Sequence, residues 1–218
     1  MSAEQPDELE LAQLMCSRIC HDLVGPVGAV NTAVELMAEE GGSGLGSDAM
    51  AVLERSVRDA GVRLTFFRRA FGMGGGAEST MPVEEIRELT SAMVPAGKIT
   101  FRIDVHAENG EPPADLPAYV AKLALIMVMV GAEAMPRGGN LSLHVAAMAD
   151  GIGLAVQGEG PGAAIRDTIS GALSSGSDIE VNARNVHAHL GLLLAGKLGT
   201  TLELSSDTDT IAIACLIP

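Results

Sequence analysis

The sequence SRICHDLVGP, residues 17–26, places a histidine and an acid side by side on an amphipathic helix. A neutral imidazole nitrogen of His21 attacks phosphorus readily. The carboxylate of Asp22 can keep the other ring nitrogen protonated and so fix the tautomer. Because Pro26 has no N–H, the carbonyl of Asp22 loses its helical donor, and we expect the helix to bend just past the histidine.

Around this stretch the apolar pattern predicts two long helices. Apolar residues recur at steps of three and four from about Pro6 to Glu40. Glycines at 41, 42 and 44 then break the chain, and Ser47 is the expected N-cap of a second helix that runs to about Phe71. We expect an antiparallel helical hairpin. One hairpin cannot cover its own apolar face, so we expect two copies to form a four-helix bundle as a homodimer.

The second half of the chain has a different sequence pattern, in which predicted helices and strands are mixed. The glycine-rich segment 72–76 predicts a boundary between two domains, residues 1–74 and residues 78–218. After it we expect helices at 82–94, 116–135, 163–173 and 183–198, and strands at 98–106, 141–148, 152–157, 201–205 and 210–217. Helices on one face of a mixed sheet make an α/β sandwich. The fold class predicted for the whole chain is therefore α+β.

Composition excludes several classes of partner. Of 218 residues 47% are apolar, yet there are only four Phe, one Tyr and no Trp, so the core must be aliphatic. The net charge of −14 argues against nucleic acid or an anionic membrane as the main partner. No uninterrupted apolar run reaches the roughly 18 residues of a membrane span. An acidic N-terminus and an odd number of cysteines, three, favour reduced thiols in the cytoplasm.

Three segments resemble bacterial sensor histidine kinases. The pattern His21-Asp22-xxx-Pro26 resembles their H-box. Residues 131–139, GAEAMPRGG, resemble the end of the N-box helix and the turn after it, and residues 156–162, VQGEGPG, resemble the strand and loop that usually read D-x-G-P-G. The resemblance implies that the α/β sandwich is a histidine-kinase-like ATPase domain.

The nucleotide ligands of that domain are missing from this sequence. Val130 stands where the kinases have the magnesium-binding asparagine, and Gly158 stands where they have the adenine-reading aspartate. No GxG phosphate loop occurs between Gly176 and Gly191. The resemblance therefore implies a degenerate ATPase domain that keeps the fold without the ATP chemistry.

A more specific resemblance covers nearly the whole chain. Residues 14–23, LMCSRICHDL, and 26–31, PVGAVN, are similar to the ChpT family of histidine phosphotransferases from alphaproteobacteria, as are 183–186, ARNV, and 191–195, GLLLA. The resemblance implies a homodimer with a central bundle and a degenerate domain on each flank. It also implies phosphoryl relay through His21, from the receiver domain of a hybrid histidine kinase to the receiver domain of a downstream response regulator.

The resemblance leaves the chain few catalytic tasks. Mg²⁺ would be supplied by the partner receiver, so we expect neither a cofactor nor a metal bound to this chain. Arg18 lies three residues before His21 on the same helix face, where it would neutralise phosphate oxygens or pair with an acid on the partner. Asp22 would orient the imidazole. The competing interpretations are a plain surface charge for Arg18 and a solvated acid for Asp22.

The residues after His21 are candidates for partner binding. Val24 and Val27 are either a docking patch for a receiver helix or part of the core. Gly25 and Gly28 either allow a partner to approach closely or only loosen the helix. Asn31 is either a polar group of the bundle core or one that faces the partner.

The other residues with reactive side chains are predicted to have structural roles. We expect Cys16 and Cys20 to be small core residues rather than metal ligands. The remaining histidines are expected to be structural or solvated; they are His106, His144, His187 and His189.

Two rival functions fit the same fold. One is an active ATP-dependent histidine kinase. The other is a non-catalytic dimeric adaptor or inhibitor, which docks receiver domains, or blocks a kinase through the bundle, without taking phosphate.

Overall fold

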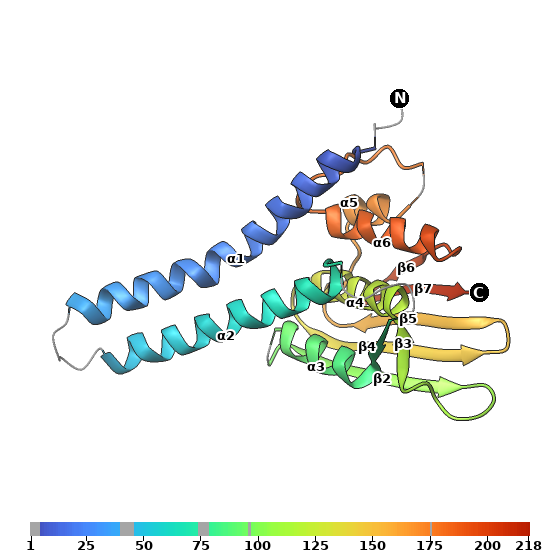
Figure 1. Ribbon diagram of the computed structural model, residues 1–218, viewed down its shortest axis with the longest axis horizontal. Coiled ribbons are helices and arrows are strands. Elements are labelled where there is room, and N and C mark those ends of the chain that lie inside the picture. The colour runs from blue at the N-terminus through green and yellow to red at the C-terminus, as the bar shows by residue number, and fades with distance from the viewer. Residues whose placement is uncertain (1–4, 40–45, 74–78, 96, 175) are drawn as a thin grey trace.

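The computed structural model describes residues 5–39, 46–73, 79–95, 97–174 and 176–218. It has an N-terminal pair of long helices followed by a sheet covered with shorter helices (Figure 1). The helices are α1 (Glu8–Glu39), α2 (Gly46–Ala70), α3 (Val83–Met93), α4 (Ala118–Glu133), α5 (Asp167–Ala172) and α6 (Val186–Lys197). The strands are β1 (Thr80–Pro82), β2 (Ile99–Ala107), β3 (Asp115–Pro117), β4 (Gly139–Met148), β5 (Gly151–Glu159), β6 (Glu203–Asp207) and β7 (Thr210–Ile217).

A capping box fixes the start of α1. The Asp7 carboxylate accepts a hydrogen bond from the Glu10 backbone N–H at 2.8 Å, and the Glu10 carboxylate accepts one from the Asp7 N–H at 3.1 Å. The helix therefore begins just after Pro6, as expected. Pro26 lies inside α1, and Figure 1 shows the helix changing direction near the middle of its length.

The second helix of the hairpin begins at Gly46, one residue before the expected cap. Ser47 therefore lies in the first turn of α2, and the prediction that it precedes the helix is wrong. The expected glycine turn at 41–44 lies outside the described residues. So does the centre of the expected boundary between residues 1–74 and 78–218, because residues 74–78 are not described.

The main sheet is mixed and has five strands in the order β2-β4-β5-β7-β6. β2 pairs with β4 in parallel, and every other neighbouring pair is antiparallel. Figure 1 shows the helices gathered on one side of this sheet, which is the predicted sandwich. The two-residue turn between β4 and β5 matches the expected hairpin at Ala149-Asp150.

A second, two-stranded sheet was not expected from the sequence. β1 pairs with β3 in antiparallel fashion, with Met81 opposite Leu116. Each of these strands ends at a proline, and a helix starts directly after it, at Val83 and at Ala118. A strand of three residues is too short to show an alternating pattern. The sequence therefore predicted a loop at 108–115 and a helix from 116, where the structure has β3 and then α4.

The core is centred on α4, which is apolar on all sides. Buried residues form a continuous run from Val120 to Gly131, broken only at Lys122. A helix of this kind must be covered all round. It packs against the sheet, α6 and α3, and also against α2 of the hairpin. None of the described helices is long and apolar enough to cross a membrane.

The root of the hairpin is part of that core, while its outer part extends away from the sheet domain (Figure 1). Phe66, Phe67 and Ala70 of α2 are buried in the common cluster, and Ile19 of α1 packs against it. The Lys122 ammonium donates a hydrogen bond to the carbonyl of Gly72, just past the end of α2. The base of the hairpin is thereby fixed to the domain near the middle of α1, where His21 lies.

Candidate functional site

His21 is exposed on α1, with 80% of its side chain accessible to solvent. Its Nδ1 lies 3.2 Å from Oδ1 of Asp22. Among the described residues Nε2 has no protein partner, so this nitrogen is open to an incoming group. The geometry is that of an imidazole whose one nitrogen is anchored and whose other nitrogen is free.

Asp22 is held from its other side by Arg18. The Arg18 Nε donates a hydrogen bond to Asp22 Oδ2 at 2.9 Å, across one turn of α1. Only 12% of the Arg18 side chain and 11% of the Asp22 side chain are exposed. Neither residue is the freely solvated surface charge that was the competing interpretation from the sequence.

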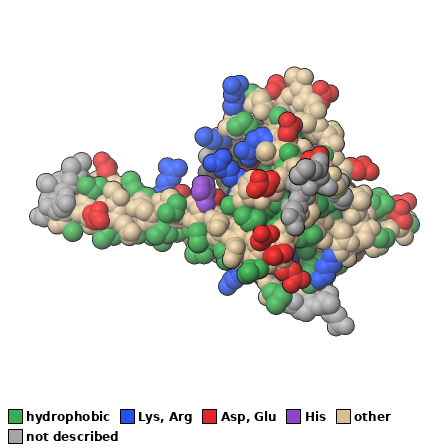
Figure 2. Space-filling model, turned by 90° about the horizontal axis from the view of Figure 1, so that it is seen from above, with side chains coloured by type: hydrophobic (Ala, Val, Ile, Leu, Met, Phe, Trp, Pro, Cys, Tyr) green, Lys and Arg blue, Asp and Glu red, His purple; other side chains and the backbone are tan. Residues whose placement is uncertain are grey.

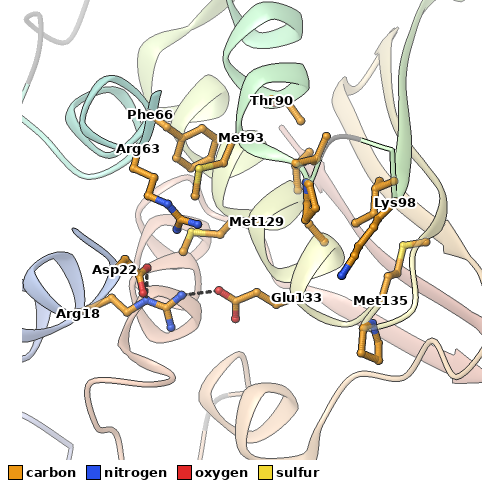
Figure 3. Close-up of a pocket in the computed structure, with 16 residues that line it drawn as sticks. Arg18, Asp22, Arg63, Phe66, Thr90, Met93, Lys98, Met129, Glu133 and Met135 are labelled. Carbon is orange, nitrogen blue, oxygen red and sulfur yellow. Dashed lines mark hydrogen bonds and ion pairs between the residues drawn. The ribbon is translucent and has the colours of Figure 1, made fainter. Parts of the chain in front are cut away.

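Arg18 also connects α1 to the sheet domain. Its Nη2 donates to Oε1 of Glu133, in the last turn of α4, and its Nη1 donates to the Arg184 carbonyl at 3.1 Å. Figure 3 shows the guanidinium of Arg18 between the carboxylates of Asp22 and Glu133. The acid that Arg18 meets in this structure thus belongs to its own chain, not to a partner protein.

Glu133 is surrounded by cationic and titratable groups. His187 Nε2 lies 3.3 Å from its Oε2, and Arg166 Nη2 lies 3.8 Å from the same oxygen. Burial raises the pKa of Glu133, but the contacts with His187 and Arg18 outweigh burial and hold the pKa below its ordinary value of 4.5. Glu133 is therefore an ionised carboxylate at neutral pH.

His187 was expected to be structural or solvated, and it is completely buried at the first turn of α6. Neither of its ring nitrogens has a hydrogen-bond partner among the described residues, although Nε2 is within ion-pair distance of Glu133. A buried imidazole in this position is unusual, because buried polar groups are nearly always paired. Glu133 and His187 are the two functional candidates that the sequence did not reveal.

A cavity of about 310 Å³ opens between α2, α3 and α4, next to the Arg18–Asp22 pair. Figure 3 shows Arg63 extending from α2 toward this pair, and Arg63 has no ion pair or hydrogen bond among the described residues. The buried Thr90 hydroxyl, which also lines the cavity, has no partner either. The remaining walls are mainly apolar, formed by residues such as Met93 and Met129.

The candidate partner-binding residues lie along α1 beyond the histidine. The side chains of Val24 and Val27 are 67% and 48% exposed, so they are not core residues of this chain. An added Cβ at Gly25 or Gly28 would meet no atom within 4 Å, so the surface above both glycines is open. Asn31 is exposed as well.

The prediction that Cys16 and Cys20 are core residues is wrong, because both are exposed. The apolar pattern of a single helix does not show which of its apolar residues are covered by other elements. Cys215 is the cysteine that is buried, and burial raises the pKa of its thiol to about 11.

The positions that bind nucleotide and metal in kinases have a different environment here. Val130 is 1% exposed and belongs to the core cluster. At Gly158 an added Cβ would lie 2.7 Å from the Met135 sulfur and 2.9 Å from Cγ1 of Ile211. A side chain at this position would therefore require Met135 and Ile211 to move.

Charge is unevenly distributed around the site. Figure 2 shows Lys and Arg side chains gathered on the sheet domain beside the root of the hairpin, although the chain as a whole carries a net charge of −14. Two exposed arginines contact the site, since Arg166 lies 3.8 Å from Glu133 and the Arg184 carbonyl accepts a hydrogen bond from Arg18. A local cationic surface suits a site that handles phosphate.

Comparison with known proteins agrees with this geometry. The profile of the histidine phosphotransferase C-terminal domain matches residues 83–210. Protein phosphotransferase ChpT of Brucella abortus (strain 2308) is 31% identical over 94% of this chain and 95% of that protein. A solved structure described as a bacterial phosphotransferase superposes with a TM-score of 0.83 and 27% identity, over 99% of this chain and 100% of that one. The histidine kinase domain of Erythrobacter litoralis EL346 superposes with a TM-score of 0.44 and 14% identity, over 88% of this chain and 93% of that domain.

The match of the family profile to residues 83–210, on a chain that superposes over 99% of its length on a solved phosphotransferase, places this protein in the class of phosphorelay histidine phosphotransferases. Within that class the chain belongs to the ChpT family. The resemblance stated from residues 14–31 and from the later segments is thereby confirmed. The activity of this chain is that of a protein phosphotransferase in a phosphorelay.

Proposed function

We propose that His21 is the residue that carries the phosphoryl group, and that Nε2 is its nucleophilic atom. The observation that supports this most directly is the exposed imidazole whose Nδ1 is held by Asp22 at 3.2 Å. Nδ1 keeps its proton in that contact, so the lone pair of Nε2 points toward solvent. An aspartyl phosphate on a docked partner is able to approach this nitrogen in line.

The reaction exchanges one bond to phosphorus for another. Nε2 of His21 attacks the phosphorus of an aspartyl phosphate, the N–P bond forms, and the P–O bond to the donor carboxylate breaks. The donor leaves as a carboxylate, and the positive charge that develops on the ring is stabilised by the Asp22 carboxylate beside Nδ1. The reverse steps deliver the phosphoryl group to an acceptor aspartate.

The partners we propose are two receiver domains, one of a hybrid histidine kinase and one of a downstream response regulator. We propose that the receiver supplies the Mg²⁺ and that this chain needs no cofactor of its own. Val24, Gly25, Gly28 and Asn31 would form part of the receiver-docking surface, since they continue the exposed face of α1 beyond His21. We further propose that the reaction takes place in the cytoplasm.

A homodimer is proposed because apolar side chains on the hairpin have no cover. On α2 the exposed residues Met50, Val57 and Leu64 are spaced seven apart, and Val27 and Val34 of α1 have the same spacing. Seven-residue spacing places these side chains in stripes along the helices. A second hairpin would bury both stripes in a four-helix bundle.

The test is transfer of labelled phosphate from a phosphorylated receiver domain to this chain. We expect an acid-labile, alkali-stable label on the wild type and no label on His21→Ala. The control is His106→Ala, which removes an exposed histidine on β2 and should not change the labelling. Equal labelling of wild type and His21→Ala would refute the assignment of His21, and absence of label on the wild type would favour the non-catalytic adaptor.

A further inference from the structure

A series of contacts between polar side chains runs without a break from the interior of the sheet domain to the reactive imidazole. Inside the domain, buried His187 lies 3.3 Å from Glu133. Glu133 accepts a hydrogen bond from Arg18, which reaches across from α1 (Figure 3). On α1, Arg18 holds one oxygen of Asp22, and the other oxygen of Asp22 holds the ring of the histidine.

We propose that Glu133 is a positioning residue for phosphoryl transfer, acting through Arg18 and Asp22 to set the orientation of the His21 imidazole. This proposal rests on the function proposed above, because it assumes that His21 is the phosphoacceptor. It assigns a task to a domain that lacks the ligands for ATP. The domain contributes a fixed carboxylate to a site whose reactive group lies on the hairpin.

The hydrogen bonds of Arg18 restrict its conformation. Its guanidinium presents its donors in a planar fork, and the three hydrogen bonds to Asp22, Glu133 and the Arg184 carbonyl use Nε, Nη2 and Nη1. Two of the three acceptors belong to the sheet domain. An arginine loses side-chain entropy when it is fixed in one conformation, and these acceptors offset that loss.

Loss of the Glu133 charge would change how Asp22 is held. Arg18 would then have a single carboxylate partner, and the guanidinium would be free to form a two-pronged pair with both Asp22 oxygens. That rearrangement would draw Oδ1 away from His21 Nδ1. Because the Asp22 contact alone fixes the tautomer among the described residues, the imidazole would then sample both tautomers and more than one orientation.

The position of Glu133 makes it suited to a fixed contact. It lies in the last turn of α4, the most deeply buried helix of the molecule, so its backbone cannot shift without disturbing the core. His187 and Arg166 flank its second carboxylate oxygen at 3.3 and 3.8 Å, leaving the first oxygen for Arg18. His187 and Arg166 therefore fix the Glu133 carboxylate independently of its contact with Arg18.

The experiment compares Glu133→Gln with wild type by two measurements. Glutamine keeps the shape of the side chain and removes the charge. The first measurement is ¹⁵N NMR of the His21 ring in the unphosphorylated protein, which reports the tautomer without any receiver present. We expect mainly the Nδ1–H form in wild type and a mixture of tautomers in Glu133→Gln. The second is the rate of phosphoryl transfer from a phosphorylated receiver, which we expect to fall by about tenfold.

The matched control is Glu84→Gln, which removes an exposed ion pair with Arg87 on α3, remote from His21. It should leave both measurements unchanged. If Glu133→Gln does not fold, as judged by circular dichroism, Arg18→Lys replaces it, because lysine keeps the charge but cannot contact three acceptors in a plane. Arg18→Lys is expected to shift the tautomer and slow transfer in the same way.

Different results would contradict the phosphoacceptor role of His21 and the positioning role of Glu133. If His21→Ala still takes up label, the proposed function is wrong whatever Glu133 does. If His21→Ala is unlabelled while Glu133→Gln and Arg18→Lys match wild type in tautomer and in rate, the positioning role is wrong and the phosphoacceptor assignment stands. A slower rate with an unchanged tautomer also contradicts positioning through Asp22.

Discussion

At the scale of single residues, the pair His21–Asp22 and the acid Glu133 differ in how visible they are in the sequence. Because His21 and Asp22 are adjacent on one helix, the sequence predicts that they contact each other, and in the structure Nδ1 of His21 lies 3.2 Å from Oδ1 of Asp22. Glu133 lies 115 positions from the arginine that it binds. Only the packing of α4 against the hairpin brings the two together, and no local pattern contains that information.

The expected loss of ATP chemistry also rests on single residues, and it gives a prediction. In Val130→Asn the magnesium-binding side chain of the kinases is restored at a position that is 1% exposed. We expect no nucleotide binding and a free energy of unfolding lower by roughly 1–3 kcal/mol, because the buried amide finds no partner in an apolar cluster. Urea unfolding measures the loss, and titration with a fluorescent ATP analogue measures binding.

The control for this prediction is Val130→Ala, which makes a cavity without burying a polar group. It should also lower stability and bind no nucleotide. Micromolar affinity for the analogue in wild type would overturn the degenerate-domain interpretation and support an ATP-dependent kinase. Micromolar affinity in Val130→Asn alone would show that Gly158 is no obstacle to the nucleotide.

At the scale of elements, α1 contains residues that weaken a helix close to His21, where we expect the partner to dock. Gly25 and Pro26 end the stretch 17–26 that holds His21, and Gly28 lies two residues after Pro26. Glycine in a helix interior costs about 1 kcal/mol relative to alanine. No other element packs against either glycine, because a Cβ at each would meet nothing within 4 Å outside its own stretch of the helix. Gly25 directly precedes Pro26, where a residue with a Cβ is disfavoured in a helix.

These glycines therefore allow stability and docking to be separated. In Gly28→Ala we expect the free energy of unfolding to rise by about 0.5–1 kcal/mol, and in Gly25→Ala to rise less, because a Cβ at position 25 crowds the ring of Pro26. In both variants we expect phosphoryl transfer from a receiver to slow several-fold, since the added methyl groups obstruct the docked partner. Gly61→Ala on α2, where a Cβ also meets nothing within 4 Å, is the control and should gain stability without loss of transfer. Faster or unchanged transfer in the first two variants would mean that the glycines only loosen the helix.

Elements with a strong period were predictable, and short ones were not. The long helices and the strands of the main sheet follow from spacings of three to four and of two residues. The predicted ends of these elements differ from the observed ends by a few residues. For example, α6 was expected to begin at residue 183 and begins at Val186. β1 and β3 are fixed by their pairing across 33 or more positions of chain and by the helices that follow them, neither of which a local pattern contains.

At the scale of the whole molecule, the uncovered stripes on the hairpin predict self-association. We expect wild type to sediment as a dimer and Val57→Glu, which places a charge in the α2 stripe, to dissociate. Burying one valine is worth about 1.5 kcal/mol or more and the dimer contains two, so the dissociation constant should rise at least about a hundredfold. Sedimentation velocity across a concentration series measures this.

Leu193→Glu is the matched control, because Leu193 on α6 is 45% exposed, close to the 55% of Val57, but lies outside the hairpin. Its dissociation constant should equal that of wild type. A dimer that survives Val57→Glu and is lost in Leu193→Glu would move the interface to the sheet domain and contradict the proposed bundle.

The order of the main sheet has a consequence for aggregation. Its edges are β2 and β6, and an open edge is a template on which a foreign strand can add. Arg102 and Asp104 of β2, and Glu203 and Asp207 of β6, place charges along both edges, so a strand adding there would have to desolvate them. Disordered strand-to-strand polymerisation is thus discouraged at both edges of the sheet. The apolar stripes of the hairpin are then the surface through which we expect two copies of this chain to meet in an assembly of fixed size.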